Sequence, residues 1–155
     1  MLEPDQEYDA ASIYITGGSQ GANYLNDVIP KALNKVNHRI RVVHQAGKGS
    51  SELVINTYLK NKFDLLVVKD FFDNPFVEIQ KADFVISRSG ALSVSEITSL
   101  NKGGLYIPLH NSIDDHQMHN AKYAVRIGMG EIFPESQSLD DLIDKLNEII
   151  AVSYT

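Results

Sequence analysis

Short apolar runs alternate with longer segments of helical periodicity along most of this chain. The apolar runs are rich in β-branched residues and are expected to be strands; they cover residues 12–16, 40–44, 65–68, 84–87, 105–109 and 131–133. Between them, apolar residues recur every three or four positions, which predicts helices over residues 22–36, 51–59, 75–81, 92–100, 116–127 and 139–150. A strand is therefore followed by a helix six times.

The predicted strands are continuously apolar and show no regular polar alternation. Such strands are typical of a parallel sheet whose two faces are both covered by crossover helices. We therefore predict an α/β fold with a Rossmann-like, doubly wound, parallel six-stranded sheet. In open sheets of this kind, ligands bind at the carboxyl ends of the strands, where loops lead into helix N-termini.

Local signals support these boundaries, with one exception. Asn74 followed by Pro75 is expected to cap the third helix, and the pair Gly103-Gly104 is expected to separate a helix from the next strand. Pro30 lies inside the first helical segment, where it should bend the helix or split it near Ile29.

The length of 155 residues gives room for one domain. Residues 1–10 are polar, acidic and aperiodic, and we expect them to be a flexible leader or the remnant of a linker. Residues 11–155 are expected to form the domain itself. The longest apolar runs fall far short of the roughly 20 residues that span a bilayer, so no membrane-spanning helix is expected.

Charge and cysteine content narrow the classes of function. The net charge is −6 and the 14 Lys and Arg residues are scattered, which argues against a nucleic-acid partner because phosphate backbones bind clustered basic side chains. A phosphate ligand would have to be held by helix N-termini and backbone amides. The absence of cysteine excludes disulfides and thiolate metal sites, and it fits a reducing cytoplasm.

The loop after the first predicted strand is glycine-rich and contains ITGGSQGAN over residues 15–23. Its glycines would let the backbone approach a phosphate closely, and Ser19 could donate a hydrogen bond together with the amides of the helix N-terminus. The spacing is not the G-x-G-x-x-G of dinucleotide folds. The second strand also ends in His44 and Gln45 instead of the acidic residue that would hold the ribose of NAD. A tight strand-to-helix turn without a ligand is the alternative.

The segment FVISRSGALSVSE, residues 84–96, carries the strongest chemical signal. Arg88 ends a buried strand beside Gly90 and a helix N-terminus, an arrangement that suits a diphosphate. Ser93 and Glu96 lie three residues apart on one face of that helix, so Glu96 could accept hydrogen bonds from ribose hydroxyls. A capping box between Ser93 and Glu96 is the structural alternative, but it does not explain Arg88.

The loop after the fifth strand leads into HQMHNA at residues 116–121. His116, Gln117 and Asn120 are expected to project from the first turns of the following helix, with His116 and Asn120 on one face. Amide side chains both donate and accept hydrogen bonds, which suits the hydroxyls of a sugar.

Two other features of this region have structural interpretations. Asp114 or Asp115 is expected to cap the helix. A zinc site through His110, His116 and His119 is disfavoured, because a fourth ligand and a carboxylate that would orient the histidines are both missing from the pattern.

Phe71 and Phe72 follow the third predicted strand. Adjacent aromatic residues are more often part of a core than of a ligand wall. One of them nevertheless ends at the carboxyl end of the strand, where its backbone could meet the edge of a nucleobase.

Four motifs taken together resemble one family. They are GGSQGA at residues 17–22, HQAGKG at 44–49, RSGALSVSE at 88–96 and HQMHNA at 116–121. In this order they closely resemble the carboxyl-terminal domain of the MurG-type undecaprenyldiphospho-muramoylpentapeptide N-acetylglucosaminyltransferases. The resemblance covers residues 12–150.

The resemblance implies one half of a GT-B glycosyltransferase, with a domain for UDP-N-acetylglucosamine over residues 11–155. By motif position, Ser19 would contact the diphosphate, the backbone of Phe72 the uracil, and Glu96 the ribose. Gln117 would bind hydroxyls of the sugar. The remaining candidates are Gly18 and Gln20 in the glycine-rich loop, Arg88 as a phosphate stabiliser, Gly90, Ala91, Leu92, Ser93, Val94 and Ser95 in the turn that offers amides to the phosphates, and His116 and Asn120 near the sugar.

Two positions depart from the family pattern. Ser93 stands where threonine is frequent, a change that keeps the hydroxyl. His116 stands where some members carry glutamine, which makes Gln117 the stronger candidate of the pair for the sugar contact.

The reaction implied by the resemblance is the inverting transfer of N-acetylglucosamine from UDP to the 4-hydroxyl of the muramoyl sugar in a lipid-linked peptidoglycan precursor, lipid I to lipid II. UDP-N-acetylglucosamine is a substrate, and neither a cofactor nor a metal is expected. The partner is an amino-terminal domain that binds the lipid-linked acceptor and supplies the catalytic base, so no base is assigned here. We expect the full-length enzyme to be peripheral on the cytoplasmic face of the cell membrane, and this domain to be inactive alone.

Two alternatives remain. The chain could be a stand-alone nucleotide-sugar-binding subunit that acts only with a separate membrane partner chain. It could also be part of a related transferase that uses a different lipid or a different sugar.

Overall fold

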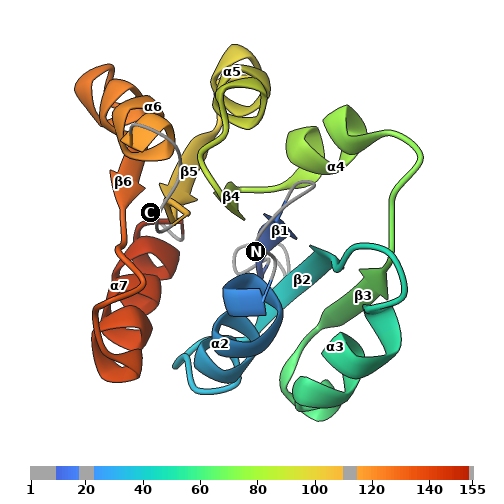
Figure 1. Ribbon diagram of the computed structural model, residues 1–155. Coiled ribbons are helices and arrows are strands. Elements are labelled where there is room, and N and C mark those ends of the chain that lie inside the picture. Colours follow the sequence, from blue (N-terminus) through green and yellow to red (C-terminus); the bar gives the residue numbers. More distant parts are fainter. Residues whose placement is uncertain (1–9, 18–22, 110–114, 154–155) are drawn as a thin grey trace, which may run out of the picture.

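The computed structural model of the chain describes residues 10–17, 23–109 and 115–153. In this part of the chain, six strands form one parallel sheet in the order β3-β2-β1-β4-β5-β6 (Figure 1). The strands are β1 (Ala11–Thr16), β2 (Ile40–Gln45), β3 (Leu65–Lys69), β4 (Phe84–Ser87), β5 (Gly103–Tyr106) and β6 (Gly130–Ile132). The predicted Rossmann-like parallel sheet is therefore confirmed.

Helices connect these strands and cover the sheet on both sides. They are α2 (Asn23–Leu33), α3 (Ser51–Thr57), α4 (Pro75–Lys81), α5 (Ala91–Ser99), α6 (His116–Arg126) and α7 (Leu139–Val152), with a short 3-10 turn η1 (Lys60–Lys62). Helices α2, α3 and α7 lie on one face of the sheet, and α4, α5 and α6 lie on the other (Figure 1).

The strand order places a topological switch between β1 and β4. The chain runs outward from β1 through β2 to β3, and it then returns to pair β4 with the other side of β1. Connections on the two sides of this switch diverge, which opens a crevice at the carboxyl ends of β1 and β4. The crevice is where a doubly wound fold holds its ligand.

Buried apolar side chains form one cluster on each face of the sheet. The cluster under α2, α3 and α7 includes Ile13, Ile15, Leu25, Ile29, Leu33, Leu142 and Leu146. The cluster under α4, α5 and α6 includes Tyr14, Ile79, Val85, Val94, Ile97 and Tyr106. Successive residues of β1 thus point to opposite faces, as strand geometry requires.

Pro30 does not split its helix. Helix α2 continues through Pro30, whose side chain is buried together with Ile29 and Leu33. Burial of this apolar face stabilises the helix against the loss of the backbone hydrogen bond that proline cannot donate. Of the two predicted effects of Pro30, the split near Ile29 was therefore wrong, and the bend stays a prediction.

Gly103 and Gly104 do not separate a helix from a strand, because they are themselves the first residues of β5. The fully buried ring of Tyr106 explains the glycine at position 104. A Cβ atom on Gly104 would lie 2.5 Å from Tyr106 Cζ, and one on Gly130 of β6 would lie 2.8 Å from Tyr106 Cε2. Space for this ring, not backbone conformation, explains why glycine stands at both positions.

Within the described ranges, no helix combines the length and the apolar character that crossing a bilayer requires.

Candidate functional site

A cavity of about 520 Å³ opens at the carboxyl ends of β1, β2 and β4, between α4 and α5. Seven of the predicted site residues line it: Arg88, Gly90, Ala91, Leu92, Ser93, Glu96 and Gln117. Seven further lining residues were not predicted: Tyr14, Thr16, Gly17, Gln45, Pro75, Ile79 and Ile97. The cavity lies at the switch between β1 and β4, the place where this fold holds ligands.

Other predicted residues do not face this cavity. Val94, Ser95 and Asn120 line a separate cavity of about 180 Å³ between α5 and α6. His116 is exposed at the start of α6 and is not part of the lining of the larger cavity. The candidates Gly18, Ser19 and Gln20, together with His110 and Asp114, lie outside the described residues.

The amino terminus of α5 forms one wall of the cavity. Gly90 is its N-cap and has no side chain to satisfy the first helical N–H groups. These groups, at Ala91, Leu92 and Ser93, have no acceptor within a helix and carry the positive end of its dipole. An anion in the cavity would therefore meet hydrogen-bond donors.

The capping box between Ser93 and Glu96 is not present. The helix begins at Ala91, so Ser93 is its third residue, and no side chain makes a capping hydrogen bond at this end. Ser93 and Glu96 both line the cavity instead. The half-buried Glu96 is thus placed one turn behind the helix terminus, next to the space that a ligand would fill.

Arg88 is 5% exposed and its guanidinium is engaged by the protein. Its Nη1 donates to the carbonyl oxygens of Ile107 at 3.2 Å and Pro108 at 3.4 Å. Its Nη2 donates to Glu135 Oε1 at 3.3 Å, and Nη1 lies 3.3 Å from Glu135 Oε2. The bidentate ion pair offsets most of the positive charge that Arg88 would otherwise present to a phosphate.

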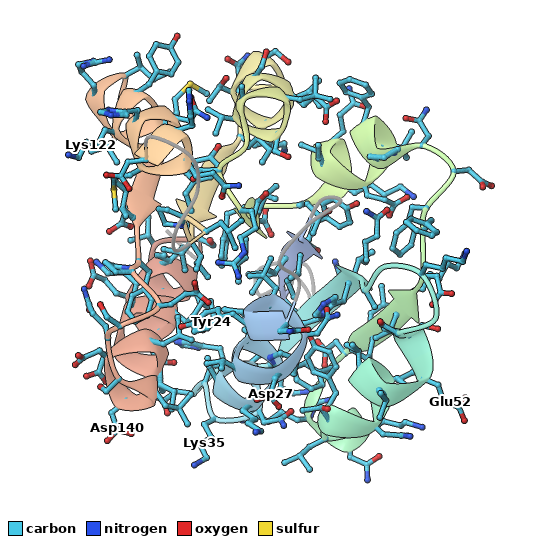
Figure 2. The ribbon with its side chains drawn as sticks, viewed as in Figure 1. Tyr24, Asp27, Lys35, Glu52, Lys122 and Asp140 are labelled. Carbon is cyan, nitrogen blue, oxygen red and sulfur yellow. The ribbon has the colours of Figure 1, made fainter. Side chains whose placement is uncertain are left out.

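The aromatic ring of Tyr24 also packs against Arg88, with the guanidinium 6.0 Å from the ring centroid. Figure 2 shows Tyr24 on the side of α2 that faces α7. Burial raises the pKa of the Tyr24 hydroxyl to about 12, with Glu135 adding to the rise and Arg88 opposing it. Arg88 therefore joins β4 to α2 and to the segment between β6 and α7.

Gln117 and Asn120 hold the loop after β4 in place. Gln117 Oε1 accepts from Leu109 N at 2.8 Å and from Ser89 N at 3.3 Å. The Ser89 hydroxyl donates to Gln117 O at 2.6 Å, and Asn120 Nδ2 donates to Ser89 O at 2.9 Å. The first turns of α6 are thus fastened to the buried Ser89 and to the loop after β5, a positioning role that the motif alone did not indicate.

Asp114 or Asp115 was expected to cap α6; the position of Asp115 is confirmed, its capping hydrogen bond is not, and Asp114 lies outside the described residues. Asp115 is the N-cap residue, but its backbone is left-handed, with φ 54° and ψ 32°, and its side chain makes no capping hydrogen bond. An N-cap side chain reaches the first helical N–H groups from an extended backbone, which Asp115 lacks. At α4 the expected cap is confirmed, because Asn74 accepts from Phe76 N at 3.2 Å.

Gln45 was not predicted as a site residue, although it lines the cavity. The parallel register places it between Thr16 of β1 and Lys69 of β3. Its Nε2 donates to Thr16 Oγ1 at 3.2 Å, and its Oε1 accepts from Phe72 N at 3.1 Å. The carboxamide thus links the end of β1 to the backbone of Phe72, the residue whose backbone was predicted to contact a uracil.

The motif HQAGKG shapes the loop between β2 and α3. Gly47 and Gly49 have φ of 92° and 74°, values that L-residues with side chains rarely adopt. Asp70 accepts from Gly49 N at 2.9 Å and from Ser51 N at 3.0 Å. These hydrogen bonds, the one from Gly49 first, hold the pKa of Asp70 below its ordinary value.

The buried His44 anchors the same motif on the face of the sheet that α2 and α3 cover. Asn26 Nδ2 donates to Ala46 O at 2.9 Å, so Asn26 Oδ1 is turned toward His44 Nε2, also at 2.9 Å. Nε2 therefore carries the proton, and Nδ1 accepts from the Tyr58 hydroxyl at 2.7 Å. Burial lowers the pKa of His44 to about 3, so the imidazole is neutral in the folded chain.

This network predicts a loss of stability in mild acid. The unfolded chain takes up a proton at His44 near the ordinary pKa of about 6.5, whereas the folded chain resists protonation until about pH 3. The free energy of unfolding is therefore unaffected by His44 above pH 6.5 and falls between pH 6.5 and 3, by at most about 1.4 kcal/mol per pH unit. Urea unfolding of the wild type and His44→Gln at pH 7.5, 6 and 4.5 measures this contribution.

His44→Gln should show a shallower pH dependence than the wild type, even though it is less stable at neutral pH. His119→Gln, at an exposed position on α6, is the control and should keep the wild-type slope. Equal slopes for all three chains would show that His44 can be protonated in the fold.

The described ranges contain no cluster of three or more His, Asp and Glu side chains placed to hold an ion. His116 and His119 both lie on exposed positions of α6.

Comparison with known proteins identifies the family. The model of the glycosyltransferase family 28 C-terminal domain matches residues 12–153. The UDP-N-acetylglucosamine--N-acetylmuramyl-(pentapeptide) pyrophosphoryl-undecaprenol N-acetylglucosamine transferase of Aliivibrio salmonicida is 38% identical over 136 residues, 87% of this chain and 38% of that protein. The transferase of the same name from Tolumonas auensis is 37% identical over 139 residues, 90% of this chain and 38% of that protein.

A solved structure agrees with this result. The crystal structure of Acinetobacter baumannii MurG superposes with a TM-score of 0.86 at 28% identity, covering 97% of this chain and 45% of that one. This chain spans about 38% of the length of the curated relatives that it matches. The family match extends over most of its residues, and the chain belongs to the glycosyltransferase family 28 C-terminal domain family.

Proposed function

We propose that the chain is the donor-binding part of an inverting glycosyltransferase that moves N-acetylglucosamine from UDP-N-acetylglucosamine to a lipid-linked muramoyl-pentapeptide. The observation that carries the proposal is the cavity at the β1–β4 switch, which brings the amino terminus of α5, Glu96 and the predicted sugar residue Gln117 together. Family membership supports the reaction class. The named activity of the Aliivibrio salmonicida relative supports the choice of UDP-N-acetylglucosamine as the donor.

The proposal assigns protein groups to the base, the ribose and the diphosphate of the nucleotide. The uracil lies next to the backbone of Phe72 beyond Gln45, and the ribose hydroxyls donate to the half-buried carboxylate of Glu96. The diphosphate meets the N–H groups of Ala91, Leu92 and Ser93 at the positive end of the α5 dipole. Ser19, Gly18 and Gln20 belong to the same phosphate site in the proposal.

The sugar is assigned to the mouth of the cavity, where Gln117 lies. Gln117 Oε1 is engaged by the backbone of Ser89 and Leu109, which fixes the orientation of its amide. His116 and Asn120 are proposed as more distant contributors because neither lines this cavity. Arg88, whose charge Glu135 offsets, is assigned to shaping the phosphate site and to a weak long-range field.

In the proposed mechanism, the chain stabilises the charge that develops on UDP as the glycosidic bond breaks. Pre-oriented amide dipoles stabilise such charge without reorganising during the reaction. The nucleophile is a hydroxyl of the acceptor, and the base that deprotonates it is assigned to a second domain or partner chain. The whole enzyme is proposed to act at the cytoplasmic face of the membrane, where its lipid-linked acceptor is held.

Calorimetric titration of this chain with UDP-N-acetylglucosamine, UDP-glucose and NADH tests the proposal. We expect both UDP-sugars to bind, with UDP-N-acetylglucosamine the tighter, and NADH not to bind, because no acidic residue ends β2. The chain alone should not transfer sugar to a lipid-linked acceptor. Failure to bind either UDP-sugar would contradict the proposal, and so would turnover by the isolated chain.

A further inference from the structure

A buried hydroxyl in the wall of the cavity has no partner in the ligand-free chain. Tyr14 is 1% exposed and lines the cavity, yet its Oη makes no hydrogen bond among the residues that the structure describes. Leaving a buried hydroxyl unpaired costs roughly 1 to 3 kcal/mol, so native structures seldom keep one without a reason. An entering ligand could supply the missing partner.

Tyr14 contacts Phe72, next to which the proposed function puts the base of the nucleotide. Its ring packs edge-on against Phe72, with centroids 6.0 Å apart. Ile79 of α4 and Ile97 of α5 are apolar neighbours in the same cluster. The Glu96 carboxylate is close enough to add to the rise in the pKa of Tyr14.

The protonation state of Tyr14 allows it to donate and to accept. Burial raises the pKa of its hydroxyl to about 12, with the side chain of Thr16 opposing the rise and Glu78 and Glu96 adding to it. Although the Thr16 hydroxyl is nearby, the geometry leaves Tyr14 Oη without a hydrogen bond. Thr16 Oγ1 accepts from Gln45 Nε2 instead.

We propose that the Tyr14 hydroxyl hydrogen-bonds the nucleoside part of the bound nucleotide, so that the ligand satisfies a donor left unpaired in the ligand-free chain. This inference rests on the proposed function, and it assigns Tyr14 as a further binding residue of the same site. Tyr14 also lines a second cavity of about 390 Å³ beside Glu78 and Lys81. Its contacts with Phe72 and Thr16, both toward the carboxyl end of the sheet, favour the nucleotide side.

The chain offers a matched control in Tyr106. Its hydroxyl is likewise buried and without a hydrogen bond among the described residues, and it belongs to the same apolar cluster, but it does not line the nucleotide cavity. Tyr14→Phe and Tyr106→Phe therefore remove the same group from equivalent surroundings. Only the first removes it from the wall of the site.

Titrations with UMP and UDP compare the two variants with the wild type. Tyr14→Phe should weaken binding of both nucleotides by the same factor, about 3- to 15-fold for one hydrogen bond. Tyr106→Phe should bind within about 2-fold of the wild type, since it touches no ligand. Neither variant should lower the melting temperature of the ligand-free chain, because each removes an unpaired polar group.

The outcomes separate this inference from the proposed function. No binding of UDP by the wild type contradicts both, whereas binding of UDP with no change in Tyr14→Phe contradicts the inference alone. The inference is also overturned if both variants weaken binding equally, or if Tyr14→Phe weakens binding of UDP-N-acetylglucosamine but not of UDP. It is overturned as well if the Tyr14→Phe chain melts at a lower temperature than the wild type or does not fold. Comparison of UMP with dUMP then locates the contact, because an effect that vanishes with dUMP identifies the ribose 2′-hydroxyl.

Discussion

Replacing Glu135 by alanine is expected to lower the free energy of unfolding by about 3 to 5 kcal/mol. The substitution leaves the guanidinium of Arg88, which is 5% exposed, without the carboxylate that offsets its charge. For a chain of this size, the melting temperature should fall by about 6 to 20 °C. Arg88→Met should lower the free energy of unfolding by less, because it leaves Glu135 unpaired and water can hydrate this more exposed carboxylate. The side chains of Arg88 and Glu135 are 6% and 26% exposed.

A double-mutant cycle and a surface pair serve as controls. The double variant Arg88→Met with Glu135→Ala should be less destabilised than the sum of the single variants, by about 1 to 3 kcal/mol. Glu131→Ala breaks the pair with Lys145, whose side chains are 46% and 28% exposed, and should cost less than about 1 kcal/mol. Additive effects in the cycle, or equal costs for Glu135→Ala and Glu131→Ala, would contradict a stabilising role for the buried pair.

Glu96→Gln is expected to weaken binding of UDP-N-acetylglucosamine by about 5- to 150-fold, corresponding to about 1 to 3 kcal/mol. The amide keeps the size of the side chain but replaces one acceptor oxygen with a donor, so it cannot accept from two ribose hydroxyls. The loss should be the same for UDP and UDP-glucose, because the proposed contact of Glu96 is with the ribose. Calorimetric titration with the three ligands measures it.

Glu78→Gln is the matched control for this experiment. Both carboxylates lie near Tyr14. Glu78, on α4, lines the cavity of about 390 Å³ and not the larger cavity at the β1–β4 switch, which Glu96 lines. Its replacement should leave affinity within about 2-fold of the wild type, as expected for a position without ligand contact. A similar loss in both variants would point to a general field effect and would remove Glu96 from the ribose site.

The strands that could be predicted best are those whose side chains carry the clearest pattern. β4 has the predicted bounds, because all four of its residues are buried in the centre of the sheet. The predicted range of β5 was displaced toward the carboxyl end of the strand, because Gly103 and Gly104 have low strand propensity. The ring that requires glycine at position 104 lies two residues later, at Tyr106. No local pattern reports a contact of this kind.

In the site, too, features set by neighbouring residues in the chain were predictable, and contacts between distant residues were not. The wall formed by residues 90–93 and Glu96 was predictable, because the helix start, the small residues and the carboxylate follow one another in the chain. The partner of Arg88 was not, because Glu135 lies 47 residues away in a segment without a motif. Tyr14 and Gln45 were missed for a related reason, since each sits within an ordinary strand pattern and reaches the cavity only through side-chain alternation.

The hydrogen bond from Phe72 N to Gln45 Oε1 has a consequence for how the proposed site would discriminate between bases. The chain supplies its own side-chain carbonyl, from Gln45, to this amide. The proposed function puts a pyrimidine carbonyl in the same place. Recognition there would be an exchange of one acceptor for another, and the number of hydrogen bonds at this amide would not change. Preference for uracil would then depend on the new hydrogen bonds that the displaced Gln45 carboxamide makes. Selectivity at this position would come from this rearrangement of the protein as much as from the base.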